Sequence, residues 1–402
     1  MKRQEITAAQ ETLRRLCAAA LRGEKISVPA DIDWREVFRE SKQQSVSLFA
    51  FQALKPSEAP EEWKRYAQVN LQNNAVIYRN HTRLHEQLTR AGIPYCILKG
   101  CSSARFYPDP LLRTMGDVDF FVQQDDLERT AELLRQADFS QEDVGEHLCH
   151  YVFCQDKFLF ELHFSLAGMP EGEAGEKIRG FLTDMTEKSH EEKIENAIFR
   201  MPSGFHHGLI ILMHTYHHLL SEGIGLRHLC DWAAFVNSFS DADFCNLFEE
   251  PLRSVGLWRF AQIMGCLVHT ALEIPYRDWM GTVDEELCGR LLKDIFAGGN
   301  FGNKDAARTN QGLAISNRGK DGVDRNIVLQ TVVSLNQLAK SRFPIFARVP
   351  VLRPFGWIAL CFYLGVRILT GKRELPNLRG MVRESKERKA LYAEFHLFET
   401  DW

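Results

Sequence analysis

The chain has 402 residues, of which 45% are hydrophobic and 25% are charged, and its formal net charge is −4. This composition is ordinary for a soluble globular protein, and the length predicts two or three domains. The small negative charge argues against a protein built mainly to bind nucleic acid, so no nucleic-acid partner is expected.

The cysteines and the hydrophobic runs predict a cytoplasmic protein. Ten cysteines are scattered along the chain without paired spacing, which is typical of reduced thiols. The first residues, Met1–Thr7, contain no apolar core like that of a signal peptide. No run reaches the roughly 18 apolar residues that a membrane-spanning helix needs.

Residues 1–75 are predicted to form a helical region. Leu13, Leu16 and Ala20 recur at helical spacing. A long helix is expected over Glu62–Ala91, because Gly92 follows it directly and glycine commonly ends helices. No motif in this part carries chemistry, so we expect it to pack as a cap on the next domain.

Residues 76–170 are predicted to form an α/β core around a pair of aspartates. A strand is expected over 93–98, and a second strand with alternating apolar residues follows Gly116. Because side chains alternate faces along a strand, Asp117 and Asp119 point together into a cleft. Two adjacent carboxylates repel each other, and a divalent cation is the usual partner that offsets this repulsion.

A third carboxylate lies on a later apolar strand, residues 157–164, where Glu161 and His163 share one face. If this strand lies beside the aspartate strand, the three acids converge. That arrangement suits two Mg²⁺ ions that clamp an in-line phosphoryl or nucleotidyl transfer. His163 is expected to orient Glu161 or a metal-bound water rather than to act as a base.

The turn after the first strand is a candidate phosphate site. Gly100 permits a tight turn, and backbone N–H groups at such a turn bind phosphate well. Lys99 and Arg113 are the cationic candidates for the triphosphate. The alternative for both is ordinary solvated surface charge, since a motif match alone is a hypothesis.

Together these motifs resemble the bacterial nucleotidyltransferases of the polymerase-β-like superfamily, over residues 75–300. The matching pieces are Ile97-Leu98-Lys99-Gly100, Leu112-Arg113, Gly116-Asp117-Val118-Asp119, Phe160-Glu161-Leu162-His163 and the segment Gly223–Asp231. The resemblance implies an α+β fold: a small mixed β-sheet core flanked by N-terminal and C-terminal helical regions.

The resemblance also implies a site. Asp117, Asp119 and Glu161 would be the catalytic carboxylates that hold two Mg²⁺ ions, with a nucleoside triphosphate as substrate. The residues expected to bind the nucleotide are Lys99, Gly100, Ser102, Ser103, Arg113, His163 and Arg227. One departure is that the usual Gly-Ser after the first strand is replaced by Gly100-Cys101-Ser102, so that the serine is displaced by one position.

Residues 171–300 are predicted to form a helical domain that closes the cleft. His214, His217 and His218 share a helix face. A zinc site would need further ligands, so we expect these histidines to be structural or to line the cleft. Arg227 and Asp231 are spaced i, i+4, so a helical salt bridge is the alternative to a ligand-binding role for Arg227.

A second cluster of metal-ligand types, Cys149, His150 and Cys154, has no second ligand pair downstream, so structural zinc is not expected there. Residues 301–326 show no hydrophobic period and are either a lid over the cleft or a disordered loop. The C-terminal region, 327–402, is expected to be helical. Its apolar stretch within 351–369 is flanked by arginines; burial in the core is favoured, and peripheral membrane contact is the alternative.

The sequence therefore predicts a Mg²⁺-dependent nucleotidyltransferase. It would move a nucleoside monophosphate from a nucleoside triphosphate such as ATP to a hydroxyl of an unknown acceptor: a sugar, a metabolite or a protein. The alternative is a catalytically silent nucleotide-binding or protein-interaction module on the same fold, which the displaced serine motivates. The oligomeric state does not follow from the sequence.

Overall fold

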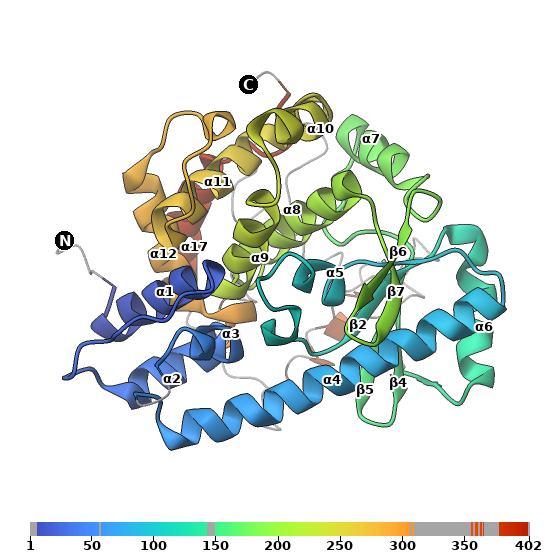
Figure 1. Cartoon of the computed structure of the whole chain (residues 1–402). Helices are drawn as coiled ribbons and strands as arrows, with labels where there is room; N and C mark the ends of the chain where they lie inside the picture. The colour runs from blue at the N-terminus through green and yellow to red at the C-terminus, as the bar shows by residue number, and fades with distance from the viewer. Residues whose placement is uncertain are drawn as a thin grey trace.

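The computed structural model describes residues 6–55, 58–142, 149–305, 308, 355–356, 358–360, 362–363, 365 and 378–400. Within these residues the protein is mostly helical, with a small mixed sheet to one side of the helices (Figure 1). The expected α+β class, a mixed sheet flanked by helices, is confirmed.

The sheet has five short strands in the order β1-β2-β5-β4-β3. Among these strands only the β2–β5 pair is parallel, and the other pairs are antiparallel. The bounds are β1 Cys96–Ile97, β2 Val118–Phe121, β3 Ser140–Gln141, β4 His150–Gln155 and β5 Phe158–His163.

One face of the sheet is apolar and buried. Val118 and Phe120 of β2 and Phe160 and Leu162 of β5 pack into a core with the long helix α4 (Glu61–Arg90) and α6 (Leu127–Gln136). The opposite face of these two strands carries the polar residues of the motifs. The predicted alternation along both strands is therefore confirmed, and it separates the core from the candidate site.

The 30-residue helix α4 confirms the predicted long helix and its end. Ala91 caps it, and Gly92 follows with φ +63°, a left-handed conformation that glycine adopts without strain. The helix crosses the expected domain boundary at residue 75. It also supports a two-stranded hairpin, β6 (His190–Ile194) and β7 (Ala197–Met201), which packs against it (Figure 1).

Most of the remaining helices lie in the regions predicted to be helical, and three short ones lie within residues 76–170. In chain order they are α1 Ala8–Leu21, α2 Trp34–Gln43, α3 Ser47–Gln52, α5 Cys101–Ala104, η1 Pro110–Leu112, η2 Gln124–Asp126, α7 Glu173–Leu182, α8 Gly204–Leu220, α9 Leu226–Val236, α10 Asp241–Ser254, α11 Trp258–Leu272, η3 Asp278–Met280, α12 Glu285–Gly298, η4 Asn300–Gly302 and α17 Leu378–Ala393.

The N-terminal helices and the helices after residue 200 share one hydrophobic core. Leu13 and Leu16 of α1 belong to the same buried cluster as Leu229 of α9 and Phe260 of α11. Figure 1 shows α1 beside α11 and α12, far from it in sequence. The helical cap and the helical domain are thus packed together, while the domain boundaries remain predictions.

The C-terminal predictions lie largely outside the described residues, including most of 301–326 and of 351–369. Where the apolar stretch is described, Phe355, Ile358 and Phe362 are 55%, 66% and 75% exposed, whereas Leu360 is buried. The expectation of burial is wrong for these three side chains. Among the described residues, no helix is long and apolar enough to cross a membrane.

Candidate active site

The pairing of β2 with β5 brings the acids together. Asp119 lies directly opposite Glu161 in the parallel register, on the polar face of the sheet. Asp117 precedes β2 by one residue. The expectation that the aspartate strand and the Glu161 strand are neighbours is confirmed, and it depended on a pairing between residues more than 40 positions apart.

Two basic side chains reach the central aspartate. Lys99 Nζ lies 2.8 Å from Asp119 Oδ1. His163 Nε2 lies 3.1 Å from Asp119 Oδ1 and 3.1 Å from Glu161 Oε2. Asp119 and His163 are only 4% and 5% exposed, so these contacts are shielded from water. Lys99 and His163 thereby offset part of the negative charge that the three acids bring.

The pKa values of the two aspartates show that the basic side chains compensate the charge of Asp119 more than that of Asp117. Burial alone would raise the pKa of Asp119, but Lys99 and His163 outweigh it and hold this pKa well below its ordinary value. The ionised Asp119, together with burial, raises the pKa of Asp117 to about 6. Burial alone would lower the pKa of His163, but its contacts with Asp119, Cys149 and Glu161 raise it to about 10.

The donor set fits a hard divalent cation. Ligand atoms of Asp119, Glu161 and His163 lie within 4.8 Å of one another, and Asp117 adds a carboxylate with uncompensated negative charge. Oxygen ligands of this kind suit Mg²⁺. The raised pKa of Asp117 follows from the neighbouring Asp119 carboxylate and burial, and a divalent cation beside it would lower that pKa.

The Gly100 turn lies against the acidic strand. Gly100 has φ +60°, and a side chain there would come within 3.8 Å of Met115 Sδ and 4.0 Å of the Asp117 carbonyl oxygen. Ser102 is fully buried, and its hydroxyl donates to the Ile97 carbonyl at 2.8 Å. Ser103 is 2% exposed. Phosphate binding by the two serines stays a prediction, and the Ser102 hydroxyl is already used by the backbone.

Arg113 was expected to bind the triphosphate, but its guanidinium pairs with the carboxylate of Asp231. Its Nε and Nη2 donate to the two carboxylate oxygens of Asp231, each at 2.7 Å. The Tyr107 hydroxyl donates to the same carboxylate at 2.7 Å. The alternative of an Arg227–Asp231 helical salt bridge is therefore wrong, since Asp231 pairs with Arg113. Direct contact of Arg113 with a nucleotide remains a prediction.

Arg227 lies near the start of α9, within electrostatic reach of Asp117. Its guanidinium is 5.4 Å from the centre of the Phe301 ring. Burial, and then the positive charge of Arg113, lower the pKa of Arg227, while Asp117 acts in the opposite sense. In the described part of the chain no ion pair of Arg227 is seen. Its side chain is thus the cation that the protein leaves least neutralised beside the acids.

The histidines of α8 and α9 gather around the same aromatic ring. The ring centres of His218 and His228 lie 4.5 Å and 5.5 Å from that of Phe301, and His214 stacks on His228 at 5.3 Å. These histidines are not among the groups of the described residues whose ligand atoms converge closely enough to hold a metal. The expectation that they are structural or line the cleft agrees with this packing.

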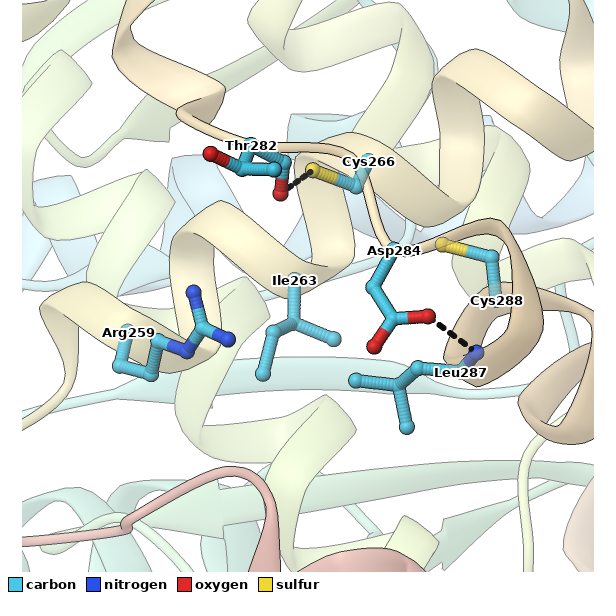
Figure 2. Close-up of a pocket in the computed structure, with 7 residues that line it drawn as sticks. All are labelled: Arg259, Ile263, Cys266, Thr282, Asp284, Leu287 and Cys288. Atoms are coloured by element: carbon cyan, nitrogen blue, oxygen red, sulfur yellow. Dashed lines mark hydrogen bonds between the residues drawn. The ribbon is translucent and has the colours of Figure 1, made fainter.

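A small pocket elsewhere carries no comparable chemistry. Figure 2 shows it lined by residues of α11, of α12 and of the segment between them. Its acid, Asp284, caps α12 by accepting from the Leu287 amide at 2.8 Å, and the Cys266 thiol faces the Met280 carbonyl at 3.5 Å. The Asp284 carboxylate already caps the start of α12, so we place the chemistry at the carboxylates of the sheet.

Fold and site first define a class: an α+β protein whose parallel strand pair presents acidic residues beside a lysine and a histidine. The family model described as "Uncharacterised nucleotidyltransferase" matches residues 30–273, which is more than half of the chain. The protein therefore belongs to this nucleotidyltransferase family. The match includes every predicted site residue.

Curated proteins and solved structures add little to the family assignment. No curated protein matches the chain significantly. Among solved structures, the chain is similar to a crystal structure of an antigenic nucleotidyltransferase-like protein from Paracoccidioides brasiliensis, with 15% identity over 50% of this chain and 93% of that chain, and a TM-score of 0.32. A TM-score this low does not establish a shared fold.

Sequence reasoning missed three features of the site: the Arg113–Asp231 pair, the position of Phe301 beside Arg227, and the closeness of Cys149 and His150 to His163. The first two join residues far apart in the chain, for which spacing gives no signal. The third had a partial signal, because Cys149 and His150 stood out as ligand types, but their partner depends on the β4–β5 register.

Proposed function

We propose that this protein is a Mg²⁺-dependent nucleotidyltransferase that moves a nucleoside monophosphate from a nucleoside triphosphate to an acceptor hydroxyl. The observation that supports it most is the pairing of Asp119 with Glu161 across the parallel strands, with Asp117 near enough that the ionised Asp119 and burial raise its pKa to about 6. A module that only packed against a partner would have no use for three crowded acids.

Asp117, Asp119 and Glu161 would hold two Mg²⁺ ions. When bound, such ions activate the attacking hydroxyl and neutralise charge on the transferring phosphate and the leaving pyrophosphate. The low pKa of Asp119 keeps this carboxylate ionised at neutral pH. His163 holds Asp119 and Glu161 side by side through its Nε2, which fixes the spacing of their oxygens.

Lys99 and Arg227 are the cations we assign to the triphosphate. Although burial alone would lower it, the surrounding carboxylates raise the pKa of Lys99, so the ammonium stays charged beside the acids. Arg227 has no competing ion pair in the described part of the chain. Arg113 would act through Asp231: its bidentate bond fixes α9, the helix that presents Arg227, against the loop that leads to β2.

The proposal is tested by thermal stability with each nucleoside triphosphate, with and without Mg²⁺. A ligand that binds only the folded protein stabilises it by about 2.7 kcal/mol at a hundredfold excess over its Kd, so no acceptor need be known. We expect a Mg²⁺-dependent rise in Tm in the native protein and none in the Asp117→Asn/Asp119→Asn double variant. The nucleotide with the largest rise would identify the preferred base.

Asp125→Asn is the matched control. Asp125 is exposed, six residues after Asp119, so the same chemical change there should leave the response intact. If no nucleotide at millimolar concentration shifts the Tm of the folded protein, transfer is contradicted and the silent-module alternative takes its place. Acceptor identity (sugar, metabolite or protein) and a cytoplasmic location remain predictions.

A further inference from the structure

A second cluster of metal-ligating side chains adjoins the three acids. Ligand atoms of Cys149, His150 and His163 all lie within 4.8 Å of one another. Cys149 Sγ is 3.3 Å from His150 Nδ1, and the His150 and His163 ring centres are 4.8 Å apart. The antiparallel register sets His150 directly opposite His163, so the two imidazoles are held together by the sheet itself.

His163 connects the two clusters through its two ring nitrogens. Nε2 faces the carboxylates of Asp119 and Glu161 at 3.1 Å. Nδ1 is buried and has no hydrogen-bond partner within the described structure. A histidine that binds a metal through one nitrogen usually donates the other N–H to a carboxylate, which fixes the ring and its tautomer. The surroundings of His163 match this arrangement.

We propose that Cys149, His150 and His163 form a Zn²⁺ site beside the Mg²⁺ carboxylates. One thiolate and two imidazoles are the ligands that Zn²⁺ prefers, whereas Mg²⁺ prefers the carboxylate oxygens next to them. Cys149 and His150 are half-buried, so an ion can enter from solvent. Three protein ligands leave a fourth position for water or another group. Binding releases the Cys149 thiol proton and the Nδ1 proton of His163 to solvent.

The ligand set differs from the one that spacing suggests. Cys154 lies on the same strand, yet its Sγ is directed to the Asp156 carbonyl oxygen at 3.7 Å, and it is not a member of the cluster. His163 on β5 takes its place. The site would hold His163 with Nε2–H pointing at Asp119 and Glu161, and so position both carboxylates. Metal binding by these three ligands does not depend on nucleotidyl transfer.

The test is a Co²⁺ titration of the reduced, metal-free full-length protein, followed by displacement with Zn²⁺. We expect one Co²⁺ per chain with a thiolate-to-cobalt charge-transfer band, lost when Zn²⁺ replaces Co²⁺ and unchanged by excess Mg²⁺. Cys149→Ser should abolish the band. His150→Gln should keep the thiolate but weaken Co²⁺ binding at least about tenfold. Circular dichroism confirms that each variant is folded.

Cys154→Ser is the matched control, since it removes a half-buried cysteine on the same strand and should leave the band unchanged. Absence of a band in the native protein, a band of equal strength in Cys149→Ser, or loss of the band in Cys154→Ser would each overturn the proposal. The Mg²⁺-dependent nucleotide response is measured separately on the native protein, and the cobalt band is measured without nucleotide, so failure of the zinc site and failure of the proposed function are distinguishable.

Discussion

Two of the places where the protein buries charge differ in how far that charge is compensated. At Arg113 and Asp231 one cation meets one carboxylate through two hydrogen bonds of 2.7 Å, and Tyr107 adds a third. At the cleft three acids share Lys99 and His163. The first region is neutral and its polar groups are satisfied internally. The second keeps surplus negative charge, which is useful only if a cation or a cationic ligand arrives.

The largest expected effect on stability comes from removing the Asp231 carboxylate that pairs with Arg113. Asp231→Ala leaves Arg113 buried without a partner and should lower the free energy of unfolding by about 3 to 5 kcal/mol, measured by chemical denaturation. The double variant Arg113→Met/Asp231→Leu removes both charges and should recover most of this loss. A loss below about 1 kcal/mol for Asp231→Ala would show that water reaches Arg113 and that the pair is not structural.

A fall in pH should destabilise the folded protein through His207, which lies within electrostatic reach of the Arg113–Asp231 pair. This side chain is fully buried between Phe106 and Phe235 with neither nitrogen hydrogen-bonded in the described structure, and burial lowers its pKa to about 3. The unfolded chain, with a histidine pKa near 6.5, therefore binds more protons between about pH 3 and 6.5. From pH 7 to pH 4 this group should remove of the order of 3 kcal/mol of stability.

His207→Phe isolates that contribution, because a phenyl ring suits the same aromatic surroundings. The variant should lose less stability than the native protein as the pH falls from 7 to 4, in paired denaturation curves. Equal pH dependence in both proteins would assign the acid sensitivity to other groups.

A smaller effect is expected from Tyr107→Phe. It removes one hydrogen bond to the Asp231 carboxylate and should cost about 1.5 to 3 kcal/mol, while the bidentate bond from Arg113 remains. Denaturation of this variant beside Asp231→Ala separates the tyrosine bond from the ion pair. A cost as large as that of Asp231→Ala would mean that Tyr107, not Arg113, holds the carboxylate.

The smallest expected effect is a gain in the free energy of unfolding, on substitution of Asp117. With the pKa of Asp117 raised to about 6, the folded protein loses stability as the pH rises from about 4, near the ordinary aspartate pKa, to about 6, and the loss is complete above pH 6. Asp117→Asn should therefore gain about 1 to 2 kcal/mol at pH 8 without metal, after allowance for partial exposure. The gain should vanish near pH 4, where Asp117 is protonated in the folded state. A loss of stability at pH 8 would show that Asp117 is already compensated in the folded protein.

Short-range periodicity determined much of the fold and part of the site. Strand alternation predicted that Asp119 lies on the face opposite Val118 and Phe120, and that Glu161 and His163 share a face. Gly92 predicted the end of α4, and the structure agrees on each of these. Such features follow from the sequence because side-chain direction and helix ends depend on a few neighbouring residues.

Tertiary structure alone decided which groups meet. The β2–β5 pairing places Glu161 beside Asp119. Arg113 pairs with Asp231, which is 118 positions away in the chain. The β4–β5 register sets His150 opposite His163. No local pattern encodes these partners, since each is selected by burial and charge compensation among distant segments. The sequence identified the candidate reactive residues. The packing of the folded chain determined which of their charges are neutralised by a neighbour and which side chains remain available for ligands.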